Sequence, residues 1–223
     1  MARPKSYERQ AVIIAAEQAF WTSGFLATGI DDLEQATGLG RSSLYLAFGS
    51  KQALFQAALA EYEGGFLTRM LAGVEAPGAG LGEAARFFAD LAAFFRDPAS
   101  RRGCLMVNSI TELAHRDAEF TPVATRLATR YHTAFSHALR GAVAQGDMDR
   151  GLLDRRAKLL ASTAHGVWVL ARADPEVAGA TCRAIAREIA SWRSNGTAPP
   201  RKPAGRTART GAQAPKSATV SKP

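Results

Sequence analysis

The segment TGLGRSSLYLAFGSKQALF, residues 37–55, carries hydroxyl, phenol and basic side chains close together. Hydroxyl and amino groups donate hydrogen bonds to phosphate oxygens, and hydroxyls also reach the polar edges of bases. A helix that starts at Lys51 would add free backbone N–H groups, which suit a phosphate. The chemistry that these residues suggest is therefore noncovalent binding of DNA.

Two short helices must position these side chains. Apolar spacing predicts one helix that follows Thr28, as its N-cap, and ends at Gly38, and a second helix over residues 41–48. At about 100° per residue, with Leu44 turned inward, the opposite face of the second helix points away from the core. The outward side chains, two hydroxyls, a phenol and one apolar group, are Ser42, Ser43, Tyr45 and Leu46. This pattern is either a helix-turn-helix, whose second helix lies in the major groove, or an ordinary surface corner.

A longer pattern is carried by Ala15, Phe20 and Gly24 and by the run TGIDDLEQATGLGRSSLYLAFGSKQALF, with Tyr45, Phe48, Lys51 and Leu54 at fixed positions. With this pattern, residues 7–55 resemble the N-terminal domain of the TetR family of bacterial transcriptional regulators. Glycine at Gly40 departs from the serine that many members have there, but it caps a helix only a few tenths of a kcal/mol, roughly, less well.

The resemblance implies a homodimer that binds double-stranded operator DNA, more often as a repressor than as an activator. It also implies an all-α C-terminal domain that binds a small effector. The alternative is an architectural protein that binds DNA without sequence preference through a basic tail. The DNA-binding residues that the resemblance implies are Ser42, Ser43 and Leu46 at bases, Thr28, Tyr45 and Lys51 at phosphates, and Arg41 beside them.

Charge is distributed unevenly along the 223 residues. The formal net charge is +8, but residues 194–223 supply six positive charges and no acid, which leaves +2 for residues 1–193. That segment has no aromatic residue and is rich in Pro, Gly, Ala, Ser and Thr, so we expect a disordered basic tail. The run AVIIAA is too short for a membrane span or a signal-peptide core, and two cysteines are too few for a disulfide framework. We expect a cytoplasmic protein without a membrane partner.

Helical periodicity predicts an all-α fold of about nine helices with short connections. The expected helices cover residues 7–22, 29–38, 41–48, 51–71, 81–96, 100–115, 119–145, 153–173 and 176–193. The expected domains are a TetR-type DNA-binding domain at 6–66 with its helix-turn-helix at about 29–48, an effector-binding and dimerisation domain at 67–193, and the tail at 194–223.

The C-terminal helices carry aromatic and apolar side chains with a few polar groups among them. Such a lining is typical of small-molecule sites and predicts a modest apolar or aromatic effector. Each aromatic residue alone is more readily explained as core than as a ligand contact. The predicted effector-pocket residues are Phe88, Leu91, Phe95, Cys104, Asn108, Glu112, Tyr131, Phe135, His165 and Trp168.

The run RRGCLMVNSI, residues 101–110, resembles a segment of a TetR subgroup that includes sensors of reactive electrophiles. In that subgroup the cysteine after glycine reacts. Arg101 and Arg102 beside a helix N-terminus would lower the pKa of the Cys104 thiol. The alternative, which we favour, is a buried and inert cysteine together with a noncovalent effector.

The last two predicted helices place small and apolar residues at heptad-like spacing. This spacing favours close helix pairing, either across a dimer in a four-helix bundle or in an ordinary core. The helix predicted over residues 153–173 has two such stripes, and the one that is not assigned to the interface consists of Leu159, Thr163, Gly166 and Leu170. The predicted dimer interface consists of Leu160, Ala164, Val167 and Ala171, followed by Ala178, Cys182, Ile185 and Ile189.

An enzyme is the third functional class to consider. Glu112 and His115 form one Glu-x-x-His pair, but a di-iron bundle needs two such pairs and two further glutamates. The sequence contains no nucleotide-binding glycine loop and no nucleophile motif. We expect no enzymatic activity, no cofactor and no bound metal.

Overall fold

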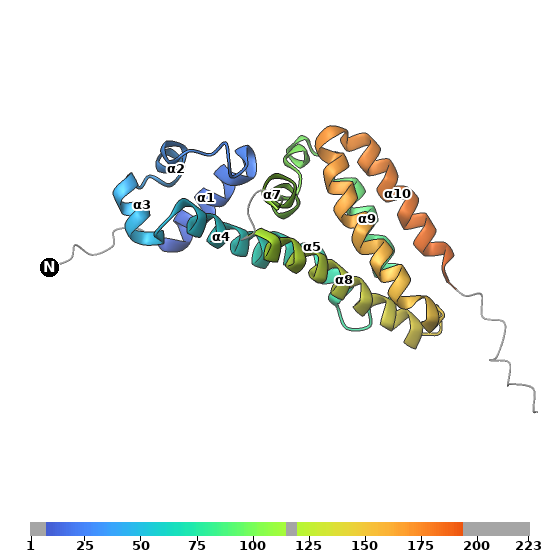
Figure 1. Cartoon of the computed structure of the whole chain (residues 1–223). Helices are drawn as coiled ribbons and strands as arrows, with labels where there is room; N and C mark the ends of the chain where they lie inside the picture. The colour runs from blue at the N-terminus through green and yellow to red at the C-terminus, as the bar shows by residue number, and fades with distance from the viewer. Residues whose placement is uncertain (1–7, 115–119, 194–223) are drawn as a thin grey trace, which may run out of the picture.

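The computed structural model describes residues 8–114 and 120–193, and every regular element in these two stretches is helical (Figure 1). The predicted all-α fold class is confirmed. No helix within the two stretches is both long and apolar enough to cross a membrane. His115 and the predicted tail at 194–223 lie outside the described residues. The α-helices are α1 (Arg9–Ser23), α2 (Ile30–Thr37), α3 (Arg41–Phe48), α4 (Lys51–Tyr62), α5 (Thr68–Glu75), α6 (Leu81–Phe94), α7 (Leu105–Leu113), α8 (Thr121–Ala144), α9 (Leu153–Ala173) and α10 (Pro175–Ser191).

Helices α1, α2 and α3 form one end of the molecule, and α4 leads from them into the larger helical body (Figure 1). Phe20 of α1 and Phe55 of α4 are buried edge to face, with 4.8 Å between ring centres. Leu33 of α2 and Leu44 of α3 are buried as well. The apolar spacing that predicted these helices therefore identifies the side that faces a small core.

The break between α3 and α4 also follows the prediction. Gly49 has a φ of 82°, a conformation that favours glycine. The Ser50 hydroxyl then accepts a hydrogen bond of 3.0 Å from the backbone N–H of Ala53. Ser50 is thus the N-cap of α4.

A π-helical turn, Glu63–Leu67, joins α4 to α5. The sequence predicted one regular helix over residues 51–71, whereas the structure continues it to Glu75 through this turn. Gly64 and Gly65 lie within the turn, where their poor helix propensity weakens the regular α pattern. Turns of this kind are frequent at functional sites.

The helix predicted over residues 100–115 consists of two elements. A 3₁₀ helix, Pro98–Arg102, ends at Gly103, and α7 begins after Cys104. Gly103 has a φ of 72°, which a right-handed helix cannot continue. The prediction of one unbroken helix is therefore wrong, and the glycine is its physical reason.

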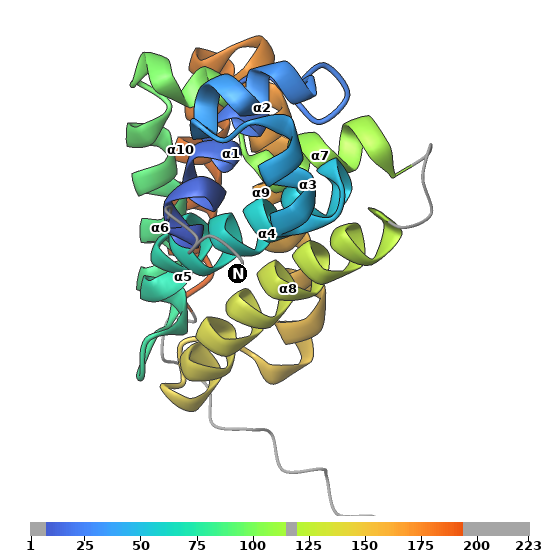
Figure 2. The same cartoon turned by 90° about the vertical axis from the view of Figure 1, so that its left-hand side faces the viewer.

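In the C-terminal body α10 packs on α6 and α9, and α8 packs on α9 (Figures 1 and 2). This packing buries most of the predicted dimer-interface residues against helices of the same chain, and their role in dimerisation stays a prediction. Small side chains at heptad-like spacing do allow close helix pairing, but the partner helices here belong to the same chain. Ile185 is partly buried against the core. The fully enclosed members are Leu160, Ala164, Val167, Ala171, Ala178, Cys182 and Ile189.

Candidate nucleic-acid interface

Helix α3 lies on the outside of the N-terminal end of the molecule (Figure 2), and the exposure of its side chains matches the expected outward face. Leu44 is 3% exposed, whereas Leu46 is 90% exposed and Tyr45 is 46% exposed. The orientation predicted from helical spacing is confirmed, and contact with DNA stays a prediction. The remaining members of the predicted set on this helix are exposed too: Arg41, Ser42 and Ser43.

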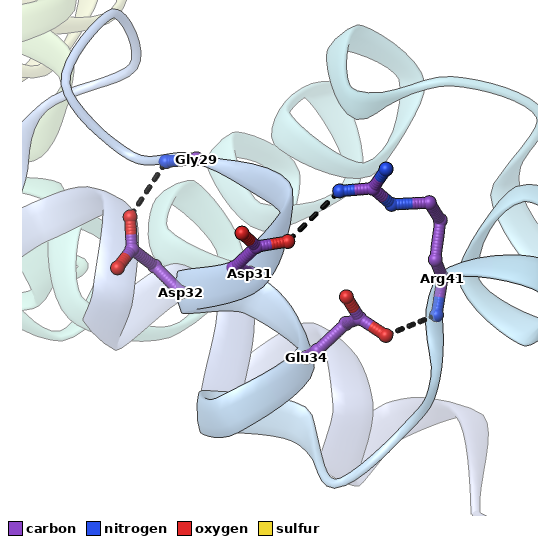
Figure 3. A network of polar contacts seen from close by, with 5 residues as sticks. All are labelled: Gly29, Asp31, Asp32, Glu34 and Arg41. Atoms are coloured by element: carbon purple, nitrogen blue, oxygen red, sulfur yellow. Dashed lines mark hydrogen bonds and ion pairs between the residues drawn. The ribbon is translucent and has the colours of Figure 1, made fainter.

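Carboxylates of α2 hold the start of α3 (Figure 3). Gly40 is the N-cap and supplies no side chain, and the Glu34 carboxylate instead accepts a hydrogen bond of 2.6 Å from the backbone N–H of Arg41. The Arg41 guanidinium forms an ion pair of 2.8 Å with Asp31. Sequence reasoning missed both contacts, because a cap supplied by a neighbouring helix has no local sequence signal.

Arg9 of α1 holds the other end of α3. Its Nη1 donates a hydrogen bond of 2.9 Å to the carbonyl of Ala47, and its guanidinium lies 4.2 Å from the ring centre of Phe48. A cation at a helix C-terminus also interacts favourably with the helix dipole. Both ends of α3 are therefore fixed by other helices of the chain.

Thr28 is not the N-cap of α2, so that prediction is wrong, whereas its contact with a phosphate stays a prediction. Gly29 occupies the N-cap position, and its N–H donates a hydrogen bond of 2.7 Å to the Asp32 carboxylate (Figure 3). The side chain of Thr28 is buried, and its hydroxyl donates to the carbonyl of Gly24 at 2.5 Å. The Thr28 hydroxyl is therefore used by a hydrogen bond to the backbone carbonyl of Gly24, and it does not cap α2.

Lys51 lies at the first position of α4. Its Nζ is 4.5 Å from the ring centre of Phe25. Burial lowers the pKa of Lys51, while the charges of Glu112 and Asp32 act in the opposite direction. Its contact with a phosphate stays a prediction.

Glu112 of α7 contacts the loop between α1 and α2. Its carboxylate accepts hydrogen bonds from the backbone N–H groups of Phe25, at 3.1 Å, and Leu26, at 2.7 Å. Gly24 has a φ of 83°, and a Cβ at this position would lie 2.9 Å from the same carboxylate. Glu112 therefore ties the segment before the helix-turn-helix to the C-terminal body. Its contact with an effector stays a prediction.

The aromatic members of the predicted effector pocket pack against one another. The rings of Phe88 and Phe135 are stacked, with 5.7 Å between centres. The Nε1 of Trp168 donates a hydrogen bond of 3.1 Å to the Tyr131 hydroxyl, and Phe95 meets the Trp168 ring edge to face. All five rings are buried. They form a filled core, so the prediction that they line an open chamber is wrong for this structure.

Four other members of that set line three different hollows. Leu91 lines one of about 340 Å³ between α6 and the π turn with α5. His165 lines one of about 330 Å³ between α8 and α9, and Asn108 and Glu112 line a polar one of about 260 Å³ between α1 and α7. The first hollow, which we call the Phe66 hollow, is lined by Phe66, Arg69, Met70, Phe87, Asp90, Leu91 and Phe94.

Cys104 is buried at the N-cap of α7. Burial raises the pKa of its thiol, and hydrogen bonds to the sulfur only partly oppose this shift. The guanidinium of Arg102 lies 4.0 Å from the ring centre of Trp21. This environment fits the buried, inert thiol and not the activated one.

Two family models match the chain. Residues 12–58 match the model described as "Bacterial regulatory proteins, tetR family", and residues 80–185 match "Tetracyclin repressor-like, C-terminal domain". YezE of Bacillus subtilis (strain 168), an uncharacterized HTH-type transcriptional regulator, is 31% identical over 150 residues, which are 67% of this chain and 77% of YezE. The chain belongs to the TetR family.

Two further TetR-type proteins are similar to this TetR-family chain. The HTH-type transcriptional repressor ComR of Escherichia coli (strain K12) is 34% identical over 113 residues, 50% of this chain and 54% of ComR. A cysteine mutant of the TetR-family regulator CifR has been solved with 26-base-pair operator DNA. It is 26% identical to this chain, and the two structures match with a TM-score of 0.70 over 86% of this chain and 100% of the CifR chain. Both relatives are named as transcriptional regulators, and the all-α fold of this chain is similar to that of CifR.

Proposed function

We propose that this TetR-family chain is a transcriptional repressor that acts in the cytoplasm, without enzymatic activity, by binding a palindromic operator as a homodimer. The observation that carries the proposal is the geometry of α3. Its ends are fixed by Glu34 and Arg9, while Leu46 projects from it 90% exposed. A rigid helix with an exposed face of hydroxyl and apolar groups suits base edges and thymine methyls in the major groove.

An exposed apolar face on α9 supports the homodimer. Leu159, Val169 and Leu170 are 50%, 49% and 40% exposed, and Val177 at the start of α10 is 48% exposed. Gly166 is exposed on the same side of α9, where a small residue allows another helix to approach closely. We assign the dimer interface to this face. Two copies related by a two-fold axis would then present two α3 helices to two half-sites.

We assign the effector site to the Phe66 hollow. Its volume of about 340 Å³ lies within the range of roughly 300–1,000 Å³ that is common for small-molecule sites. Three aromatic rings, a methionine and a leucine form most of its lining, and the charges of Arg69 and Asp90 have opposite signs. An uncharged, flat aromatic compound of one or two rings fits this chemistry.

Phe66 connects this hollow to the DNA-binding end of the chain through ring contacts. Its ring centre lies 5.5 Å from that of Trp21 on α1 and 6.2 Å from that of Trp168 on α9. Phe66 is also part of the π turn between α4 and α5. A ligand that displaces the Phe66 ring would therefore change its contact with α1. It would also disturb the π turn at the end of α4, the helix that follows α3.

Selection of binding sites from random duplex DNA tests the operator. We expect an inverted repeat bound by two chains, with a preference over bulk DNA of about 10³-fold or more. Equal binding of all sequences would support the architectural alternative and contradict the repressor.

The uncharged fluorescent probe N-phenyl-1-naphthylamine tests the effector site. Met70→Trp should fill the Phe66 hollow and weaken probe binding about tenfold or more, while Leu26→Trp, at a residue 53% exposed elsewhere, should leave it unchanged. Unchanged probe binding by Met70→Trp would contradict this assignment.

A further inference from the structure

Arg41 is the first residue of α3, and α2 holds it twice. The Glu34 carboxylate accepts a hydrogen bond from its backbone N–H, and the Asp31 carboxylate pairs with its guanidinium Nη2 (Figure 3). The first contact fixes the start of the helix. The second contact fixes the direction of a long, flexible side chain that would otherwise sample many rotamers.

Asp31 lies in the first turn of α2, where the helix dipole favours an acid, and its carboxylate faces solvent beside α3. Its side chain is 86% exposed and that of Arg41 is 57% exposed. An exposed ion pair adds little to folding stability, and a carboxylate near DNA is repelled by phosphates. Asp32 and Glu34 have structural roles as acceptors for backbone N–H groups, whereas the contact that the described part of the chain gives Asp31 is the one to Arg41.

The geometry of the pair leaves donors of Arg41 for another acceptor. A guanidinium has five N–H donors in a planar fork, and the bond to Asp31 involves the Nη2 group. Paired N–H donors match the O6 and N7 acceptors of guanine, which is the commonest specific contact of arginine in the major groove. Residues at the N-terminus of a recognition helix are the ones that contact base edges.

We propose that Arg41 reads one guanine in each operator half-site and that Asp31 is the positioning residue that aims its guanidinium at that base. The proposal rests on the proposed binding of an operator through α3. The carboxylate also offsets part of the arginine charge, which makes Arg41 a weaker contact for an arbitrary phosphate. The pair therefore favours selectivity over general affinity for DNA.

The proposal is tested by selecting binding sites with wild type, Arg41→Ala, Arg41→Lys and Asp31→Asn. The affinity of each protein is then measured on the wild-type site and on the same site with that guanine replaced. We expect one invariant guanine per half-site for wild type, with a discrimination on the order of ten- to a hundredfold. Arg41→Ala should abolish it. Asp31→Asn should reduce it several-fold while binding to random DNA stays equal or rises. Asp154→Asn, which removes a 67% exposed carboxylate from the pair with Lys158 on α9, is the matched control and should change neither quantity.

A different pattern would overturn the proposal. If Arg41→Ala weakens all sequences alike, lowers the salt slope by about one and is rescued by Arg41→Lys, Arg41 holds a phosphate. If Asp31→Asn leaves the guanine discrimination unchanged, Asp31 does not position Arg41. If wild type itself selects no inverted repeat, the proposed function fails first. Melting curves of the variants separate these outcomes from loss of folding.

Discussion

The carboxylate of Glu112 on α7 accepts a hydrogen bond of 2.7 Å from the backbone N–H of Leu26, in the loop that leads to α2. A second bond comes from the N–H of Phe25. Charged acceptors form stronger hydrogen bonds than neutral ones, so this contact joins the two parts of the chain firmly. A movement of α7 would displace the loop before the helix-turn-helix.

We predict that Glu112→Gln lowers the free energy of unfolding by about 1–3 kcal/mol. The amide keeps the shape of the side chain but turns an NH₂ group toward one of the two backbone donors. Urea denaturation measures the change, and operator affinity should fall with it because the loop loses its anchor. Glu176→Gln, at an exposed position of α10, is the control and should change stability by less than about 1 kcal/mol. A Glu112→Gln protein as stable as wild type would show that the contact contributes nothing.

The helix-turn-helix was predictable because its determinants are local. Gly49 with its positive φ ends α3, and the burial of Leu44 and exposure of Leu46 follow from spacing within one helix. The cap that Glu34 supplies to Arg41 was not predictable in this way. A carboxylate on α2 has many possible partners until the two helices are placed in space.

The C-terminal body was less predictable because its determinants are distant in sequence. The small residues of α9 and α10 indicated close helix pairing, but spacing does not say whether the partner helix belongs to the same chain. As a polar side chain in an apolar segment, Glu112 suggests an effector contact from the sequence alone, because its partner Leu26 lies 86 residues earlier. The π turn did have a local signal, since Gly64 and Gly65 interrupt a helical pattern.

A glycine at a close helix contact provides the second prediction. A Cβ on Gly141 of α8 would collide with the carbonyl oxygen of Ala79, a backbone atom that cannot move aside as a flexible side chain can. We expect Gly141→Ala to lower the free energy of unfolding by about 1–3 kcal/mol. Gly73 of α5 is exposed, and a Cβ there meets no described atom within 4 Å, so Gly73→Ala should raise stability by roughly 0.5–1 kcal/mol. Urea unfolding of both variants measures the signs, and a stabilised Gly141→Ala protein would contradict this packing.

The exposed face of α9 provides the third prediction. Val169→Asp would bury a charge in the proposed dimer interface, so we expect sedimentation equilibrium to give the mass of one chain for this variant and of two chains for wild type. Ile14→Asp changes a residue of similar exposure on α1, 44% against 49%, and should stay dimeric. A dimeric Val169→Asp protein would place the interface elsewhere.

The buried cysteine of α10 leads to a prediction about alkaline pH. Burial raises the pKa of Cys182 to about 12, whereas a thiol in an unfolded chain titrates near pH 8.5, roughly. Below that value both states hold the proton, and the contribution of Cys182 to stability is fully present. As pH rises toward 12, the unfolded chain releases a proton that the folded chain keeps, so stability falls by up to about 1.4 kcal/mol per pH unit for this group.

Urea unfolding at pH 7.5, 9 and 10 measures that slope. Cys182→Ala should flatten it, because the alanine side chain has no proton to release from the unfolded chain. Ser136→Ala removes a polar atom from another buried position of the body and should keep the wild-type slope, since a serine hydroxyl does not titrate in this range. Cys104→Ala should also flatten the slope, because burial raises the pKa of that thiol in the same direction. Equal slopes for wild type and Cys182→Ala would mean that this thiol is as accessible to solvent in the folded chain as in the unfolded one.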